Sequence, residues 1–340
     1  MSKQTLLVTG GCGFIGSNFV RLLLDEHSDI TVVNLDALTY AGNLASLADY
    51  ADDPRHIFVK GDIRDAELLA RVFAEHSIDG IINFAAESHV DRSIEGPGIF
   101  VETNVLGTLA LLQAGRAAGV KRFLQVGTDE VYGSLGATGL FTETTPITPN
   151  SPYSASKAGA DHLVRAFHHT YGVDTIITRC SNNYGPYQFP EKMLPLMVNN
   201  ARHDKTLPVY GDGLQVRDWL YVYDHCTALL AAYTRGVAGE VYNIGGCNEK
   251  TNLEVVRAIL SHLGKPESLI KHVTDRPGHD RRYAIDASKM MRELDWKPSV
   301  TFEQGLAKTL DWYSANTAWV ESVTSGDYQS YYTSMYANRG

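Results

Sequence analysis

Three glycines near the start of the chain constrain its fold more than any other feature. Gly10 and Gly13 lie between an apolar run, 5–8, and a segment with helical spacing of its apolar residues, 14–24, and Gly16 lies in the first turn of that segment. Glycines at such a strand-to-helix turn allow a tight bend and let backbone N–H groups approach a phosphate. The pattern therefore predicts a βα unit whose helix begins at an anion site, and it favours a dinucleotide-binding fold.

Apolar runs further along the chain repeat this unit. Two helical patterns, at 66–76 and 103–118, alternate with expected strands, which are 31–35, 56–59, 80–84 and 122–126. Continuously apolar strands that alternate with helices indicate a parallel sheet covered on both faces. The expected fold class is α/β, a doubly wound parallel sheet of the Rossmann-like kind, with ligands at the carboxyl ends of its strands.

The second half of the chain is less regular, because prolines and glycines interrupt it. We expect residues 1–180 to form mainly the dinucleotide-binding domain. Residues 181–330 should form mainly a smaller α/β substrate-binding lobe, interleaved with the first, and 331–340 a polar tail.

Composition excludes several classes of function. The formal net charge of −9 and the lack of a long basic run argue against nucleic acid as a partner. No apolar stretch approaches the roughly 18 residues of a membrane span, and the start lacks signal-peptide features. Four scattered cysteines predict reduced thiols in a cytoplasmic protein, with neither a disulfide frame nor a metal site.

An acidic residue ends the second expected strand. A carboxylate at Asp36 would accept hydrogen bonds from the adenosine ribose hydroxyls and repel a 2′-phosphate, so the sequence predicts NAD and not NADP. Asp62 and Ile63, after the third strand, either flank adenine or form a plain turn. Both interpretations stay open on the sequence alone.

Tyr153 and Lys157 lie four residues apart, on one face of an expected helix. A tyrosine that accepts an alcohol proton near neutral pH needs its pKa lowered from about 10 to about 7. That shift requires about 4 kcal/mol of differential stabilisation of the phenolate. A nearby ammonium supplies ~3–4 kcal/mol, and a nicotinamide cation could supply the rest. The alternative is an exposed pair on a solvated helix; the glycine turn upstream favours catalysis.

Thr128, Asp129 and Glu130 follow the fifth expected strand, where substrate should lie. The hydroxyl can bind a substrate oxygen or the phenolate. The two carboxyls are either a polar loop or an acid and a base for proton transfers beyond oxidation.

Several stretches together resemble the dTDP-glucose 4,6-dehydratases over nearly the whole chain. The matching stretches are the glycine turn, 36–44, 85–93, 128–130, 151–157, 181–186, 217–222 and 275–280. The glycine turn and the Tyr-x-x-x-Lys pattern of 153–157 occur in many relatives, whereas the Thr-Asp-Glu triplet, 41–44 and 276–280 are much narrower. Ala37 and Cys247 depart from the family pattern, which often has lysine and histidine there. The resemblance implies the Rossmann-like fold, NAD as cofactor, dTDP-glucose as substrate and a role in deoxysugar biosynthesis such as that of dTDP-rhamnose.

The resemblance also implies roles for individual residues. With the glycine turn, the cofactor site comprises Gly10, Gly13, Phe14, Ile15, Gly16, Asp36, Ala37, Leu38, Thr39, Asp62, Ile63, Phe84, Ala85, Ala86, Glu87, Ser88, Thr103, Tyr153, Lys157 and Asn183. The nucleotide-sugar site comprises Glu87, Thr128, Asn182, Lys192, Met193, Pro208, Val209, Tyr210, Arg217, Asn252, Asp275, Arg276, Pro277, Gly278 and His279. Arg217 and Lys192 are also the cations that a diphosphate needs, although each could be a plain surface cation.

The implied reaction begins with proton removal by Tyr153 and oxidation at C4 of the sugar. Glu130 then takes the C5 proton, Asp129 protonates the departing C6 hydroxyl, and hydride returns to C6. A nucleotide-sugar 4-epimerase or decarboxylase needs the tyrosine, the lysine and NAD but not the acid pair. A non-catalytic NAD-binding sensor needs neither the tyrosine and lysine nor the acid pair.

Relatives in this family form a homodimer through helices that correspond to 103–118 and 154–171. The resemblance therefore implies the same for this chain. The alternative is that both helices pack only on their own sheet.

Overall fold

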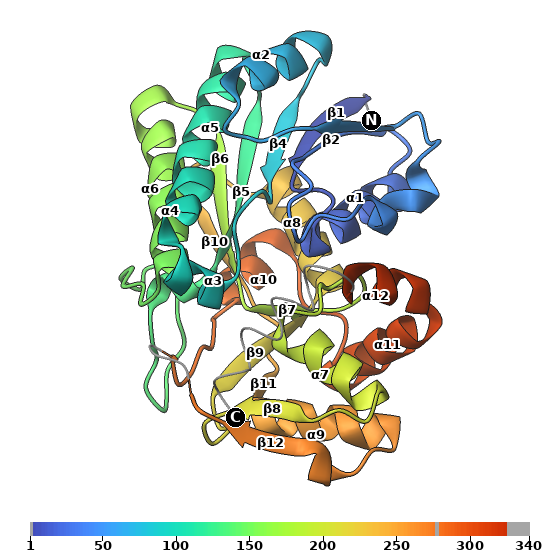
Figure 1. The fold of residues 1–340 in the computed structure, drawn as a ribbon. Coiled ribbons are helices and arrows are strands. Elements are labelled where there is room, and N and C mark those ends of the chain that lie inside the picture. The colour runs from blue at the N-terminus through green and yellow to red at the C-terminus, as the bar shows by residue number, and fades with distance from the viewer. Residues whose placement is uncertain (1–2, 276–278, 325–340) are drawn as a thin grey trace.

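The computed structural model describes residues 3–275 and 279–324. Its main feature is a seven-stranded parallel sheet, drawn in the upper part of Figure 1. The order is β3-β2-β1-β4-β5-β6-β10, and the bounds are His56–Lys60, Ile30–Asp36, Gln4–Thr9, Gly80–Asn83, Arg122–Thr128, Thr175–Cys180 and Val241–Ile244. The doubly wound fold class is confirmed. Because the chain crosses to opposite sides after β1 and after β4, a crevice for ligands opens at the carboxyl ends of these strands.

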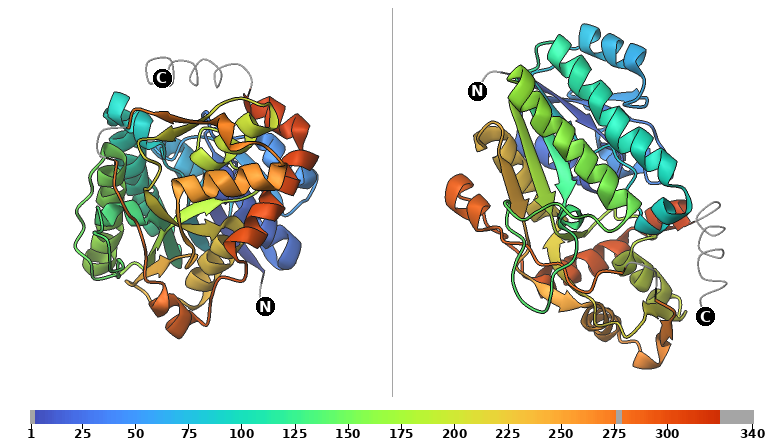
Figure 2. Two further views of the ribbon diagram at one scale, coloured as in Figure 1. Left: turned by 90° about the horizontal axis from the view of Figure 1, so that it is seen from below. Right: turned by 90° about the vertical axis from the view of Figure 1, so that its left-hand side faces the viewer.

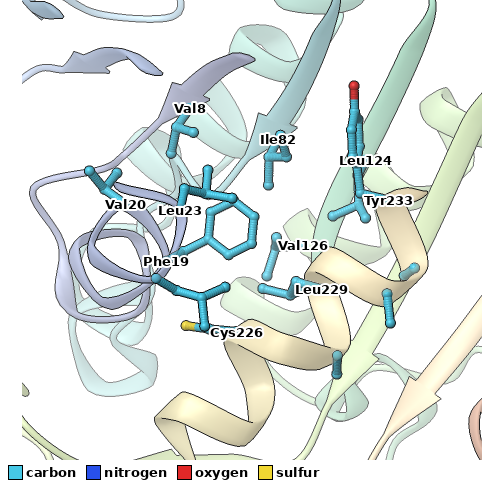
Figure 3. Packing of buried hydrophobic residues seen from close by; sticks show 14 of the residues in the cluster. Val8, Phe19, Val20, Leu23, Ile82, Leu124, Val126, Cys226, Leu229 and Tyr233 are labelled. Atoms are coloured by element: carbon cyan, nitrogen blue, oxygen red, sulfur yellow. The ribbon is translucent and has the colours of Figure 1, made fainter. Parts of the chain in front are cut away.

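Helices cover both faces of this sheet. One face carries α1, Phe14–Glu26, and α8, Val222–Arg235, whose core side chains Phe19 and Leu229 meet Val126 of β5 in Figure 3. The other face carries the parallel helices seen in front of the sheet on the right of Figure 2; they are α2 (Ala66–Glu75), α5 (Thr108–Ala117) and α6 (Pro152–Tyr171).

The sequence of α6 explains why this helix is long and well bounded. Ser151 forms a capping box with Ser154, and Pro152 occupies the first turn, where its missing N–H costs nothing. Gly172 ends the helix in the left-handed conformation, with φ of 68°. The helix therefore begins one residue before Tyr153, so that the tyrosine lies in its first turn near the sheet's carboxyl edge.

Shorter elements connect the strands of the sheet. They are η1 (Leu44–Tyr50), α3 (Val90–Glu95), α4 (Pro97–Phe100), the π-helical turn η2 (Val101–Gly107), the 3₁₀ turn η3 (Asp129–Tyr132) and α10 (Ser288–Leu294). The helix predicted over 103–118 is thus a π turn followed by α5.

A smaller lobe lies below the sheet in Figure 1, with an apolar core of its own. Its strands are β7 (Asn182–Tyr184), β8 (Leu207–Tyr210), β9 (Val216–Tyr221), β11 (Glu249–Thr251) and β12 (Ile270–Val273). Its helices are α7 (Met193–Arg202), α9 (Asn252–Leu263), η4 (Glu267–Leu269), α11 (Phe302–Ala315) and α12 (Thr317–Thr324).

The two halves of the chain are not separate in this architecture. Strand β10 comes after β7, β8 and β9 in sequence, yet it pairs with β6 and forms one edge of the large sheet. The division at residue 180 stays a prediction, and the polar tail 331–340 lies outside the described residues. Within residues 3–275 and 279–324, no helix is long and apolar enough to cross a membrane.

Candidate active site

A cavity of about 500 Å³ opens between the carboxyl edge of the sheet and the smaller lobe. It brings together most of the residues predicted from the sequence. Those on the sheet side are Gly10, Gly13, Phe14, Ile15, Gly16, Asp36, Ala37, Thr39, Asp62, Ile63, Phe84, Ala85, Ala86, Glu87, Ser88, Thr103, Thr128, Asp129, Glu130, Tyr153 and Lys157. Those on the lobe side are Asn182, Asn183, Lys192, Met193, Pro208, Val209, Tyr210, Arg217, Asn252 and His279.

Two predicted residues lie outside the lining, and three cannot be placed. Leu38 has φ of 53°; its backbone N–H donates to Asp36, while its side chain packs against the core behind β2. Asp275 does not line the cavity. It accepts a hydrogen bond from the side-chain amide of Gln215 at 2.9 Å, and its other oxygen is hydrogen-bonded to Nδ1 of His279 at 2.6 Å. Arg276, Pro277 and Gly278 lie outside the described residues.

The glycine turn has the shape that a phosphate requires. A Cβ on Gly10 would lie 2.8 Å from the backbone nitrogen of Ala85, and one on Gly16 would lie 2.2 Å from the carbonyl oxygen of Gly10. Gly13 lines the cavity, and among the described side chains none caps α1 there. The first amides of α1 therefore remain available to an anion, so these residues fit a dinucleotide.

Asp36 is a buried carboxylate fixed by the backbone. Only 7% of its surface is exposed, and it accepts from the N–H groups of Cys12 at 2.8 Å and Leu38 at 2.7 Å. Burial raises its pKa, while these two hydrogen bonds lower it. Its remaining lone pairs can accept from ribose hydroxyls.

Tyr153 and Lys157 are both buried in the wall, and the environment of the tyrosine differs from the sequence-based expectation. The Lys157 ammonium donates to the carbonyl of Val126 at 2.7 Å. Burial raises the pKa of Tyr153 well above its usual value and the charge of Glu130 raises it further, whereas a hydrogen bond with Thr128 lowers it. The sequence predicted that Lys157 lowers the pKa of Tyr153, but Lys157 is not among the main influences on that pKa. Burial also lowers the pKa of Lys157 itself.

The acid pair is placed by a sharp turn after β5. The Thr128 hydroxyl accepts from the Glu130 N–H at 3.3 Å, and Gly133 ends the turn with φ of 84°, where a Cβ would lie 2.4 Å from the Thr148 carbonyl. Asp129 is 2% exposed, and its Oδ2 atom accepts no hydrogen bond from the described residues. Burial, followed by the charges of Glu130 and Asp218, raises its pKa well above the usual range, while the charge of Arg217 lowers it; the environment therefore favours the protonated form.

Hydrogen bonds behind the wall hold these groups in register. Asn104, within the π turn η2, donates to the Glu87 carbonyl at 3.0 Å and to the Ser156 hydroxyl at 2.8 Å. Its own side-chain oxygen accepts from the Glu87 N–H. The extra backbone residue of a π turn thereby aims one amide at both α6 and the loop after β4.

Cations stand on the lobe side of the cavity. Arg217 is buried; it donates to the carbonyls of Val216 and Asp280, and its guanidinium lies 4.3 Å from the centre of the Tyr283 ring. Lys192 donates to the Ser88 carbonyl at 2.7 Å. Both are therefore oriented groups of the cavity and not solvated surface cations.

The structure adds residues that sequence reasoning did not select. Glu191, with a side chain 2% exposed, pairs with Arg92 at 3.3 Å and accepts from the Tyr40 hydroxyl, and burial raises its pKa. In the sequence, the one feature that could have pointed to Glu191 is its position next to the predicted cation Lys192. Other lining residues without an assigned role are His89, Asp91, Ser181, Gln188, Phe189 and Trp219. Within the described part of the chain, no group of three or more His, Cys, Asp or Glu could hold a metal ion.

Comparisons with known proteins agree with this geometry. Residues 7–309 match the family described as GDP-mannose 4,6 dehydratase. The dTDP-glucose 4,6-dehydratase of Xanthomonas campestris pv. campestris is 60% identical over 343 residues, 96% of this chain and 97% of that protein. DesIV, a dTDP-glucose 4,6-dehydratase of Streptomyces venezuelae solved with NAD and a second ligand, has a TM-score of 0.91 and 54% identity, covering 94% of this chain and 100% of that one.

A relative with a different activity has nearly the same fold. The UDP-glucose 4-epimerase of Thermotoga maritima, solved with UDP-glucose, has a TM-score of 0.87 and 29% identity, and the match covers 92% of this chain and 100% of that one. The overall fold is therefore similar in proteins named for two different reactions.

Proposed function

The chain belongs to the GDP-mannose 4,6 dehydratase family, and from that membership we propose that it dehydrates dTDP-glucose to dTDP-4-keto-6-deoxyglucose as an NAD-dependent hydro-lyase. One observation carries the choice of dehydration within the family. The buried acid Asp129 and its neighbour Glu130 line the same cavity as Tyr153 and Lys157.

The first step is proton removal from the sugar C4 hydroxyl by Tyr153. When bound, NAD⁺ supplies the hydride acceptor for C4 and later returns the hydride to C6, and its cationic ring favours the ionised tyrosine. Thr128 keeps the phenol oriented through its hydrogen bond. Lys157, fixed on the Val126 carbonyl, adds positive charge beneath the site.

The second step is loss of water from C5 and C6. A 4-ketone makes the C5 proton acidic, because the resulting carbanion is an enolate, and Glu130 accepts that proton. Asp129 donates its proton to the C6 hydroxyl, which would otherwise leave as hydroxide. Burial, and after it the charge of Glu130, raises the pKa of Asp129, which favours the protonated form that this step uses.

The final step restores the enzyme. After hydride reaches C6, Glu130, whose proton exchanges with solvent, returns a proton to C5. Tyr153 has by then gained the proton of the C4 hydroxyl, and Asp129 has given one to the departing water, so transfer of one proton from Tyr153 to Asp129 restores both side chains. The product is a 4-keto-6-deoxy sugar nucleotide, which suits a role in deoxysugar biosynthesis such as that of dTDP-rhamnose. Since no net oxidation occurs, the activity is that of a lyase.

The lobe binds the nucleotide end of the substrate. Arg217 on β9 and Lys192 at the start of α7 both line the cavity, and a diphosphate bound there would meet charge-assisted donors from both residues. Asn182 and Asn252 add neutral donors and acceptors at the same wall.

The deciding experiment follows the product by mass. Purified protein is incubated with dTDP-glucose in deuterated water. We expect loss of one water, solvent deuterium at C5, and transfer of hydride from C4 to C6 within one molecule. Formation of the C4 epimer without water loss would favour the epimerase alternative. Binding of NAD without any turnover would favour a sensor.

We further propose a cytoplasmic homodimer. Exposed apolar side chains gather on η2 and at the end of α6, where Val101 is 49%, Leu106 52% and Tyr171 50% exposed. Burial of this face against a second copy would join η2–α5 and α6 of both chains in a four-helix bundle. All four cysteines are free thiols, as a reducing compartment favours.

A further inference from the structure

Two segments far apart in the sequence meet at the cofactor side of the cavity. One is 39–46, which follows β2 and Asp36. The other is α12, which lies below α1 in Figure 1. They are joined by side chains of Trp319 and Ser322, both on α12.

The contact consists of two hydrogen bonds. The indole N–H of Trp319 donates to the hydroxyl of Ser46 at 3.1 Å, and the side-chain amide of Asn43 donates to the hydroxyl of Ser322 at 3.4 Å. Ser46 is 2% exposed, so its bond with the indole is shielded from competing water.

Residues 39–46 connect this contact to the dinucleotide cradle. Thr39 and Gly42 line the cavity, and a Cβ on Gly42 would lie 2.8 Å from Oδ1 of Asp36. The N–H of Asn43 donates to the carbonyl of Cys12, inside the glycine turn, at 2.9 Å. The segment therefore contacts both the ribose-side carboxylate and the phosphate-side turn.

An aromatic cluster holds α12 in place. The Trp319 ring lies 5.2 Å from that of Trp312 and 5.7 Å from that of Tyr187, centre to centre. Arg21 of α1 lies 4.6 Å above the Tyr187 ring and donates to the Ser46 carbonyl at 2.9 Å. Ser46 therefore accepts one hydrogen bond at its carbonyl from α1 and another at its hydroxyl from α12.

We propose that Trp319 is a positioning residue that fastens residues 39–46 over the bound dinucleotide and slows its release. This proposal rests on the proposed function for its purpose. A reaction that restores NAD in every turnover gains nothing from cofactor exchange, so a fastened cofactor keeps the enzyme ready for the next substrate. The N-terminal domain alone, without α12, would lack this fastening.

The test measures how fast NADH leaves the full-length protein, from the decay of its bound-state emission after an excess of NAD⁺ is added. Trp319→Phe keeps an aromatic ring and removes the N–H; Ser46→Ala removes the acceptor. Each should speed release by about three- to tenfold, the size expected for loss of one neutral hydrogen bond. The double variant should be no faster than the quicker single variant, because both changes delete the same bond.

Trp296→Phe is the matched control. Its indole N–H donates to the Thr227 hydroxyl at 3.0 Å, so the change removes the same kind of bond far along the chain from residues 39–46. Release from this variant should equal that from wild type. The KM for dTDP-glucose should stay within about twofold in Trp319→Phe, since the lobe cations bind that substrate.

Three outcomes separate the possibilities. Unchanged release from Trp319→Phe and Ser46→Ala, or additive effects in the double variant, would overturn the proposal. A general loss of structure is recognised by a lowered melting temperature together with an equally raised KM for the sugar, and that pattern also overturns it. Rapid NADH binding without dehydration of dTDP-glucose would refute the proposed function while leaving the release measurement valid.

Discussion

Asp36, the last residue of β2, and Asp129, the first residue after β5, are both buried and line one cavity, yet their surroundings favour opposite charge states. Asp36 receives two backbone N–H groups at 2.7 and 2.8 Å. Asp129 has an oxygen without a hydrogen-bond partner among the described residues, and a second carboxyl, Glu130, beside it. Burial raises the pKa of both, but only Asp129 is pushed further by a neighbouring charge.

The difference shows that burial alone does not decide whether a carboxyl binds or donates a proton. Donors aimed at Asp36 stabilise its anion, which is what a ribose hydroxyl needs as an acceptor. At Asp129 one oxygen has no donor among the described residues and Glu130 is adjacent, which favours the acid, the form that a departing hydroxyl needs. The local arrangement of N–H groups around β2 and β5 therefore divides the cavity into a binding half and a proton-transfer half.

The largest expected effect is at Asp129. Asp129→Asn removes the acid for the C6 hydroxyl and should slow water loss by about 10²–10⁴-fold. Oxidation at C4 should persist, so NADH and the 4-keto-glucose nucleotide should accumulate on the enzyme. Rapid-quench mass analysis measures both. Tyr153→Phe is the contrasting variant, because it should block the NADH burst itself. Water loss at the wild-type rate in Asp129→Asn would reduce the acid pair to a polar loop.

The same substitution at Asp36 should act on binding. Asp36→Asn loses a charged acceptor, and such hydrogen bonds contribute about 1.5–3 kcal/mol, so NAD⁺ should bind roughly 10- to 100-fold more weakly. The affinity for NADP⁺ should fall less than that for NAD⁺, because the variant lacks the charge that repels the 2′-phosphate. Calorimetry with both cofactors gives the comparison. Tighter binding of NADP⁺ than of NAD⁺ by the wild type would contradict the assignment of Asp36.

Stability should respond to the two variants with opposite sign. Asp36→Asn leaves a buried backbone N–H facing an amide donor, which costs about 1–3 kcal/mol. The folded-state pKa of Asp129 is raised, so its stabilising contribution is complete below the unfolded pKa and is lost as pH rises through the folded one. Asp129→Asn should therefore match wild type near about pH 3, below the unfolded pKa of about 3.9, and exceed it near about pH 9. Urea unfolding at both pH values tests this; equal penalties for both variants would abolish the contrast.

The smallest expected effect is at Asp62, the carboxylate just after β3. Its side chain is 33% exposed and pairs with Arg64 at 2.8 Å. Burial would raise its pKa, but the hydrogen bonds with Arg64 more than offset that and lower it. Since exposed ion pairs contribute about 0–1 kcal/mol, Asp62→Asn should change NAD⁺ affinity by less than about fivefold. A loss as large as that of Asp36→Asn would assign Asp62 to the adenine site.

Local pattern was enough to predict one part of the sheet. Strands β1 to β5 are short apolar runs with glycine or polar boundaries, and their positions are confirmed within a few residues. Strand β6 was missed because polar residues interrupt its short apolar run and one of them is a buried arginine, Arg179. That charge is tolerated because Asp161 of α6 pairs with it at 2.9 Å, a partner that only the folded chain reveals.

The site follows the same division. Residues adjacent to strand ends, such as Gly13, Asp36 and Asp129, could be selected because chain position and chemistry coincide. The environment of Tyr153 could not be anticipated, since its pKa depends on burial and on Glu130, which only the fold brings near it. The π turn at Asn104 was equally invisible, because one extra backbone residue hardly alters the spacing of apolar side chains.

The late arrival of β10 has a consequence for how this protein is made. On the ribosome, β6 has been synthesised well before β10, yet its free edge has no other partner within the described sheet. At about 5–20 residues per second, the interval between them lasts on the order of 3–13 s. During that time an unpaired edge strand is exposed to association with other chains. The nascent chain therefore has an aggregation-prone edge on β6 until the smaller lobe is nearly half translated. We expect chaperones to bind the chain during this interval.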